Sequence, residues 1–93
     1  MMIALDYDLT YTRDPKAWDE VVRIMTVMGH SFVCVTGRDQ PPRASEPRIP
    51  MPIVCAGDEL KSVAAVKAGY FVDVWIDDCP GTIERSVKLD FAS

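Results

Sequence analysis

Two closely spaced pairs of carboxylates are the residues best suited to chemistry in this chain. Asp6 and Asp8 follow one short apolar run, and Asp77 and Asp78 follow another near the opposite end of the sequence. Gathered in one site, such groups repel one another by about 4 kcal/mol for a pair about 4 Å apart at an effective dielectric near 20. The site must therefore retain protons or hold a cation, and carboxylate oxygens are ligands for hard ions such as Mg²⁺. The predicted metal ligands are Asp6, Asp8, Asp77 and Asp78.

Within this set, Asp6 and at least one of Asp77 and Asp78 are expected to contact the ion directly. Asp8 has a different expected role, because it lies two residues beyond the end of its strand on a turn. A carboxyl group there can protonate a departing oxygen and afterwards activate water. Thr10 follows, with a hydroxyl that can brace the same turn.

Groups suited to binding phosphate lie elsewhere in the chain. Thr36 and Gly37 end a second apolar run, where a hydroxyl and backbone N–H groups can hold phosphate oxygens. Arg38 follows them and either reaches the same anion or is solvated. Lys61 and Lys67 compete for the cationic role. Lys61 is preferred because it lies in the first turn of a predicted helix, and Lys67 is about 9 Å further along the axis.

Alternating strands and helices must position these residues. The apolar runs predict short buried strands. Their expected ranges are 2–5, 32–35, 53–55 and 71–76. A first helix starts at Asp14-Pro15, an N-cap residue followed by proline, and stops at Gly29. Its predicted core stripe is Trp18, Val21, Val22, Met25 and Met28.

Two further helices and one long loop complete the expected layout. The second helix opens at Gly57-Asp58 and stops at Gly69, and a third spans about 80–87. A possible fifth strand covers 89–92. The segment 38–52 holds most of the prolines, so it is predicted to be a loop, and loops of that length are usually functional or disordered.

This order predicts an α/β fold, a Rossmann-like three-layer sandwich with a short, mostly parallel sheet of four or five strands in one domain, 1–93. Parallel strands end at one edge of the sheet, where ligands bind in the crevice. The residues of that edge should converge although they are far apart in sequence. They are Asp6, Asp8, Thr36, Asp77 and Asp78.

The motifs resemble those of the haloacid dehalogenase-like superfamily of phosphohydrolases. The segment 3–10, IALDYDLT, is similar to its first motif, an apolar strand followed by Asp-x-Asp-x-Thr. The segment 32–37, FVCVTG, looks like its second motif, and 75–78, WIDD, looks like its fourth. Lys61 suits the third motif, which is a lysine before the fourth strand. The resemblance spans residues 2 to 80 and implies a HAD-like fold.

The resemblance also implies a mechanism. Asp6 would be the nucleophile that forms an aspartyl-phosphate, and Asp8 would be the general acid and base. Thr36 and Lys61 would hold the phosphate, and Asp77 or Asp78 would anchor Mg²⁺. The family's cap domains have no room here, because the connections after Asp8 and after the third strand are short. The expected protein is a capless magnesium-dependent phosphatase with an open crevice, and such a crevice makes a homo-oligomer plausible.

Other interpretations of the same residues stay open. A receiver-like phosphoacceptor domain also places an acid pair, a hydroxyl and a lysine around magnesium, although Cys55-Ala56 stands where its phosphoacceptor would be. A non-catalytic binding or regulatory module of the same fold is a third hypothesis. The single residues also have structural interpretations: helix capping for Asp77-Asp78, turn chemistry for Thr36-Gly37, and a solvated side chain for Lys61.

The composition indicates which partners and which cellular compartment are expected. The net charge of -4 disfavours stable nucleic-acid binding, which relies on a basic face, but a phosphorylated end-group remains an acceptable substrate beside small molecules. The three cysteines form no Cys-x-x-Cys pair, which favours a reducing compartment. No signal peptide and no run of 18 apolar residues is visible, so a cytoplasmic protein without a membrane span is expected.

Overall fold

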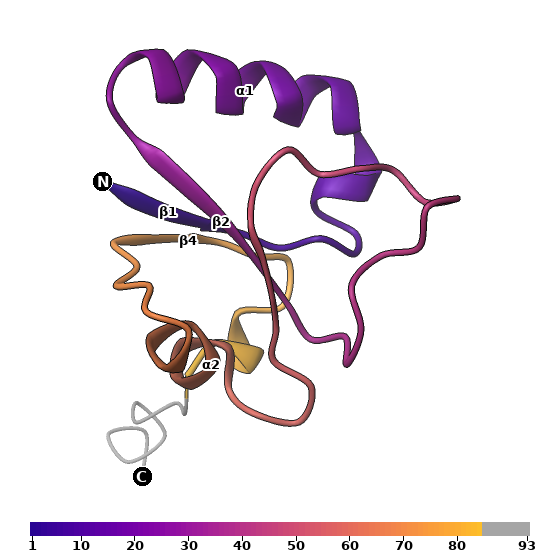
Figure 1. The fold of residues 1–93 in the computed structure, drawn as a ribbon, viewed down its shortest axis with the longest axis vertical. Coiled ribbons are helices and arrows are strands. Elements are labelled where there is room, and N and C mark those ends of the chain that lie inside the picture. The colour runs from indigo at the N-terminus through magenta and orange to yellow at the C-terminus, as the bar shows by residue number, and fades with distance from the viewer. Residues whose placement is uncertain (85–93) are drawn as a thin grey trace, which may run out of the picture.

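Four parallel strands form the centre of the protein, in the order β3-β2-β1-β4. The computed structural model describes residues 1–84 (Figure 1). The strands are β1 (Met2–Leu5), β2 (Ser31–Thr36), β3 (Ile53–Cys55) and β4 (Val74–Ile76). The helices are α1 (Pro15–Val27) and α2 (Lys61–Lys67), with short 3₁₀ turns η1 (Tyr11–Arg13) and η2 (Pro80–Thr82). The predicted α/β class with a small parallel sheet is confirmed.

The two helices lie on opposite sides of the sheet (Figure 1). The connection through α1 runs from β1 to β2, and the connection through α2 runs back across the sheet from β3 to β4. Because such crossovers are right-handed, opposite directions of travel place the helices on opposite faces. Both faces of β1 and β2 are therefore covered, which explains why these strands are continuous apolar runs.

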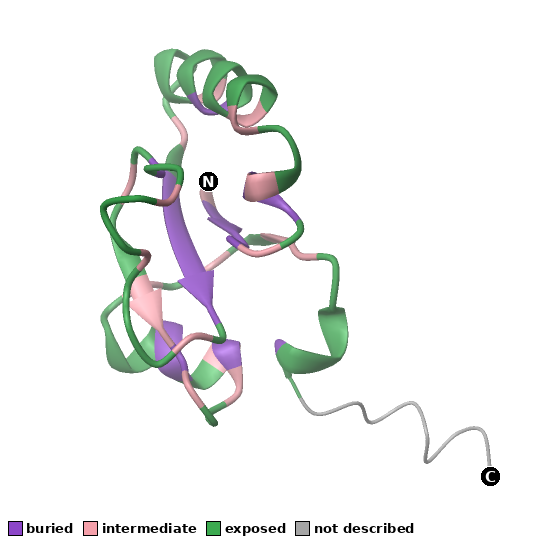
Figure 2. Cartoon of the chain, turned by 90° about the vertical axis from the view of Figure 1, so that its right-hand side faces the viewer, coloured by how far each residue is buried: buried purple, intermediate pink, exposed green. Residues whose placement is uncertain are grey.

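Each face of the sheet has its own apolar core. On the α1 side, Ile3 and Leu5 pack with Val22 of the helix, and Trp18 and Met25 pack against this cluster. On the α2 side the cluster is Ala4, Val33, Val35 and Ala65. Successive residues of β1 thus alternate between the faces, as the pleat requires. Figure 2 shows β2 buried through the sheet while the outer surfaces of both helices are exposed.

The ends of α1 follow the sequence signals. Asp14 caps the helix by accepting a hydrogen bond from Ala17 N at 3.2 Å, and Gly29 ends the segment with φ +93°. The predicted stripe is correct for three of its members and wrong for two. Val21 and Met28 are exposed, because only the face centred on Val22 lies against the sheet.

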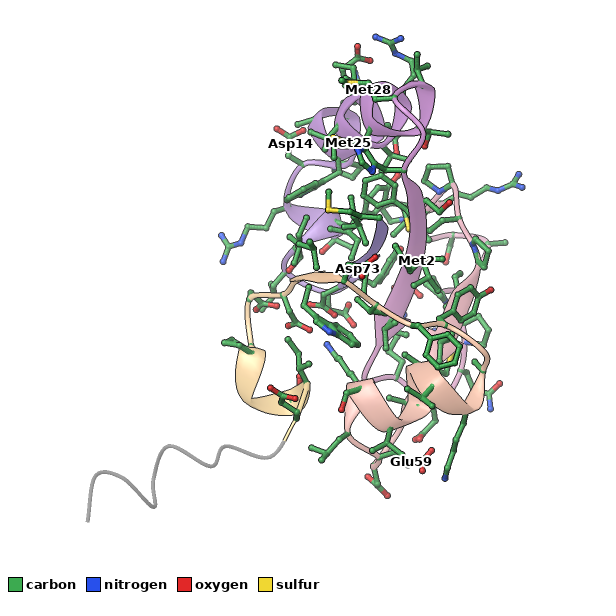
Figure 3. The ribbon with its side chains drawn as sticks, turned by 90° about the vertical axis from the view of Figure 1, so that its left-hand side faces the viewer. Met2, Asp14, Met25, Met28, Glu59 and Asp73 are labelled. Carbon is green, nitrogen blue, oxygen red and sulfur yellow. The ribbon has the colours of Figure 1, made fainter. Side chains whose placement is uncertain are left out.

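The fourth strand is shorter than predicted. It begins at Val74, not at residue 71, and Phe71 is 77% exposed. The reason lies in its partner: Val74 pairs with Ile3, so β1 offers almost nothing for earlier residues to pair with. Asp73, the residue before the strand, donates its backbone N–H to Met2 O and accepts a hydrogen bond from Met2 N, both at 2.8 Å. These two residues lie side by side (Figure 3).

The second helix begins at Lys61, later than the predicted start at Gly57-Asp58. Gly57 has φ +57°, and Leu60 is extended at the N-cap, so the intervening residues form a turn. The positive φ favours glycine at this position, because a Cβ would strain the backbone, and the nearest atom to such a Cβ is the carboxylate end of the exposed Asp39 side chain, at 2.6 Å.

The predicted third helix is a 3₁₀ turn over the residues that the structure describes. Pro80–Thr82 makes one short turn, and the rest of the predicted range 80–87, like the possible strand at 89–92, lies largely or wholly outside the described residues. Within residues 1–84, neither α-helix has the length and apolar character needed to cross a membrane.

The proline-rich segment between β2 and β3 has no regular secondary structure, as predicted, but it packs on the sheet. Ile49 is buried in the α1-side core. The Tyr7 hydroxyl donates to Pro47 O at 2.5 Å, and the Tyr11 hydroxyl lies 2.9 Å from Arg48 O. The Tyr7 and Tyr11 rings stack at 5.9 Å. This loop therefore helps α1 to cover one face of the sheet.

The anchoring role of the loop gives a stability prediction. Ile49→Ala should lower the free energy of unfolding by about 2–4 kcal/mol, because it empties a buried site. Urea denaturation followed by tryptophan fluorescence measures the change. The control is Val27→Ala at a site 78% exposed, where a change within about 0.5 kcal/mol is expected. Equal effects at both positions would contradict the packing role of the loop.

Candidate active site

The candidate site lies where β1 and β4 end. The chain crosses from β3 back to the far side of β1, so the strand order reverses between β1 and β4. Ligands of open parallel sheets bind at such a switch point, outside the carboxyl ends of the strands. Asp6 follows β1 and Asp77 follows β4, and Asp6 N donates to Ile76 O at 3.0 Å. Strand pairing itself therefore brings the two carboxylates together.

Three carboxylates converge there. One oxygen each from Asp6, Asp77 and Asp78 lies within 4.8 Å of the other two, among the residues that the structure describes. The side chains of Asp6 and Asp77 are 6% and 2% exposed, whereas Asp78 is exposed, so the group opens to solvent on one side. An all-oxygen donor set open to water suits Mg²⁺, which binds one or two carboxylates and keeps several waters.

Lys61 neutralises part of this charge. Its Nζ lies 2.9 Å from Asp6 Oδ1 and 2.6 Å from Asp77 Oδ2, and the lysine is 4% exposed. Burial alone would lower the pKa of Lys61, but the hydrogen bonds to Asp77 and Asp6 outweigh it and raise the pKa, so the ammonium stays charged. Lys67, the competing candidate, is exposed and pairs with Glu59 on the surface. The structure thus places Lys61 against Asp6.

Asp6 and Asp78 lie close enough to shift each other's pKa, and both lie near the Thr10 hydroxyl. Burial, followed by the hydrogen bond with Asp78, raises the pKa of Asp6 to about 6. The hydrogen bond with Asp6 is the main reason that the pKa of Asp78 is lowered. The Thr10 hydroxyl lies 3.3 Å from Asp6 Oδ2 and 3.2 Å from Asp78 Oδ1. Without a cation, Asp6 is therefore the member of this pair that takes up a proton as the pH falls below about 6, and a divalent ion would compete with that proton.

Asp8 lies at the same cleft but outside the group of three carboxylates. Arg38 holds it through two hydrogen bonds, Nε to Oδ2 at 2.8 Å and Nη2 to Oδ1 at 2.7 Å. The structure thus brings Asp6, Asp77 and Asp78 together and directs the Asp8 carboxylate toward Arg38.

A shallow cleft of about 330 Å³ joins these parts. The residues that line it are Asp6, Asp8, Leu9, Gly37, Arg38, Lys61, Asp78, Cys79 and Thr82. Thr36, predicted to hold phosphate, is buried beneath this surface, and its hydroxyl accepts a hydrogen bond from Arg38 N at 3.3 Å. Gly37 is the part of that motif that reaches the cleft.

Sequence reasoning left Arg38 undecided between an anion and solvent, and it missed Glu46. The Arg38 guanidinium bridges the carboxylates of Asp8 and Glu46 and lies with Cζ 5.1 Å from the centre of the Tyr7 ring, and the arginine side chain is 30% exposed. No periodicity or spacing links these residues, since Glu46 lies inside an irregular loop. The one available signal was that an arginine beside a carboxylate-rich site needs an anionic partner.

Comparisons with models of protein families, with curated proteins and with solved structures found no match for this chain. The candidate site therefore rests on its own geometry. Three carboxylates converge beside one buried lysine, and Asp6, Asp78 and this lysine share a cleft with a fourth carboxylate, which an arginine holds.

The two lysines provide a matched test of the buried ion pairs. Lys61→Met should lower the free energy of unfolding by about 3–5 kcal/mol, because it leaves Asp6 and Asp77 without a cation. Lys67→Met should change it by about 1 kcal/mol or less, since its pair with Glu59 is exposed. Chemical denaturation without divalent ions measures both, and similar losses would contradict the central role of Lys61.

The proton on Asp6 gives a prediction for metal binding. Mg²⁺ competes with that proton, so its affinity should fall by up to about tenfold per pH unit below pH 6 and level off above it. Isothermal titration calorimetry between pH 5 and 8 measures this. Asp6→Asn should remove the dependence, whereas Asp58→Asn, at an exposed position, should keep it. Equal affinity at pH 5 and pH 7.5 would contradict the assignment.

Proposed function

We propose that this chain is a magnesium-dependent phosphomonoesterase in which Asp6 carries the phosphoryl group as an aspartyl-phosphate. One observation supports it above the others: a buried carboxylate, Asp6, lies beside a buried lysine and two further carboxylates at the switch point of a parallel sheet. We also propose that the fold is a capless Rossmann-like sandwich of the haloacid dehalogenase-like type, which its strand order and its helices on both faces support.

The reaction would proceed by two displacements. In the first, an Asp6 carboxylate oxygen attacks phosphorus, the bond from phosphorus to the ester oxygen breaks, and Asp8 gives that oxygen a proton. In the second, Asp8 takes a proton from water as the water oxygen attacks phosphorus, and the bond to Asp6 breaks to release phosphate. Both carboxylates lie at one cleft, which this sequence of steps requires.

The charges of the site match this chemistry. Bound by Asp6, Asp77 and Asp78, Mg²⁺ would supply positive charge to the phosphoryl oxygens. Lys61 adds a second cation on the buried side of Asp6 and orients the nucleophile through its contact with Oδ1. Gly37 lines the cleft, where its backbone would lie against a phosphate oxygen.

The geometry gives the receiver-like alternative less support. That alternative requires a phosphoacceptor carboxylate after β3, which ends at Cys55 on the edge of the sheet. The buried carboxylate beside the lysine follows β1 instead. The substrate of the proposed phosphatase is a phosphorylated small molecule or macromolecular end-group, since the cleft is shallow and open.

The proposal predicts turnover of p-nitrophenyl phosphate that depends on Mg²⁺. Asp6→Asn should lower kcat by about a thousandfold or more, because the nucleophile is lost. Asp58→Asn, outside the cleft, should retain the native rate within about threefold. Steady-state assays with and without EDTA measure both.

An acid-quenched phosphoenzyme separates the alternatives. A labelled phosphoryl group that appears and is lost within each turnover, and is absent from Asp6→Asn, supports the phosphatase. A phosphoenzyme that persists for minutes without turnover favours the receiver. Equal rates for the native chain and Asp6→Asn would refute the proposed function.

A further inference from the structure

Arg38 makes a set of contacts that take no part in the two displacement steps of the proposed reaction. Its guanidinium donates four hydrogen bonds, two to Asp8 and two to Glu46, at 2.7–2.8 Å. The arginine side chain is 30% exposed, and that of Glu46 is 28% exposed. Exposed ion pairs usually contribute little to stability, except where an arginine binds carboxylates in a bidentate manner, as it does here with both Asp8 and Glu46. The same bidentate geometry fixes where the Asp8 carboxylate lies, and this is the effect that bears on the proposed reaction.

Three neighbouring groups fix the orientation of the guanidinium plane of Arg38. Asp8 lies on one edge and Glu46 on another, while the Tyr7 ring lies against Cζ at 5.1 Å. Tyr7 stands between Asp6 and Asp8 in the sequence, and its hydroxyl is bonded to Pro47 O. Because the guanidinium is rigid and planar, these contacts leave it one orientation.

Glu46 is held in place by hydrogen bonds within its own turn. Its Oε1 accepts a hydrogen bond from Arg43 N at 2.9 Å, and its backbone N–H donates to Arg43 O at 2.9 Å. The loop that carries this turn is anchored by buried Ile49. A continuous chain of contacts therefore runs from the core, through Glu46 and Arg38, to Asp8.

We propose that Glu46 is a positioning residue for the reaction, acting through Arg38 to hold the Asp8 carboxyl in the orientation needed for proton transfer. The inference rests on the proposed function. A carboxyl group has lone pairs beyond the two that the arginine occupies, so Asp8 can carry or accept a proton while it stays bound to Arg38. Loss of Glu46 frees one end of Arg38, and the Asp8 carboxyl then samples orientations that do not reach the leaving oxygen.

The test compares two substrates that differ in their need for a proton. The p-nitrophenolate group leaves readily without protonation, whereas phenolate leaves poorly unless Asp8 protonates it. For Glu46→Gln, kcat/KM on phenyl phosphate should fall by about tenfold to a hundredfold, and that on p-nitrophenyl phosphate by about threefold or less. The matched control is Glu59→Gln, which removes an exposed partner of Lys67 and should leave the ratio of the two substrates unchanged.

This readout distinguishes positioning from a merely structural effect. Partial unfolding or loss of metal lowers both rates together and leaves their ratio unchanged. Arg38→Lys provides a second variant, because lysine cannot bind two carboxylates in a fixed plane, and it should change the ratio in the same direction. Either variant tests the positioning role, provided that circular dichroism shows the variant to be folded.

The outcomes separate the two proposals. A selective loss on phenyl phosphate supports the positioning role. If Glu46→Gln leaves the ratio of kcat/KM on the two substrates unchanged, whether or not both values fall, the positioning role is overturned while the proposed function stands. A native chain that hydrolyses neither substrate in the presence of Mg²⁺ overturns the proposed function and the positioning role together.

Discussion

The contact of Lys61 with two carboxylates is the interaction on which the rest of the site depends. Asp6 comes from β1, Asp77 from β4 and the lysine from α2, so one ammonium group joins three elements at the edge of the sheet. Removing charged groups from water is expensive unless their pairing is close, and both contacts are short. One lysine does not balance three acids, and the remaining negative charge on the open side is the feature on which the proposed magnesium site rests.

The parts of the fold that depend on local chemistry could be predicted from the sequence. The cap at Asp14 needs one side chain and the neighbouring backbone, and the buried run of β1 needs both faces covered. The acid pairs and Lys61 were identifiable because parallel strands bring their ends together. In contrast, the start of β4 depends on where β1 begins, which nothing within the β4 segment indicates. The start of α2 depends on the positive φ of Gly57, which places this glycine in a turn before the helix.

The pairing of Asp8 with Arg38 and Glu46 shows the same limit within the site. These residues come from the turn after β1, the end of β2 and an irregular loop, and no periodic pattern relates them. Their meeting depends on how the proline-rich loop folds back over the sheet, which in turn depends on burial of Ile49. Specificity in an open cleft of this kind depends on loops, so the segment that sequence patterns describe least is the one that shapes the surroundings of Asp8.

One central residue has a consequence of a different kind. Cys34 lies in the middle of β2 with no exposed surface, and burial, more than the neighbouring Asp6, raises the pKa of its thiol to about 12. Because the thiolate is the reactive form, Cys34 does not react with alkylating reagents while the sheet is closed. Cys79, in contrast, lies on the surface and is accessible to them. Modification of Cys34 by an alkylating reagent therefore reports opening of the sheet at β2, between its pairings with Leu5 and Ile53, without any engineered label.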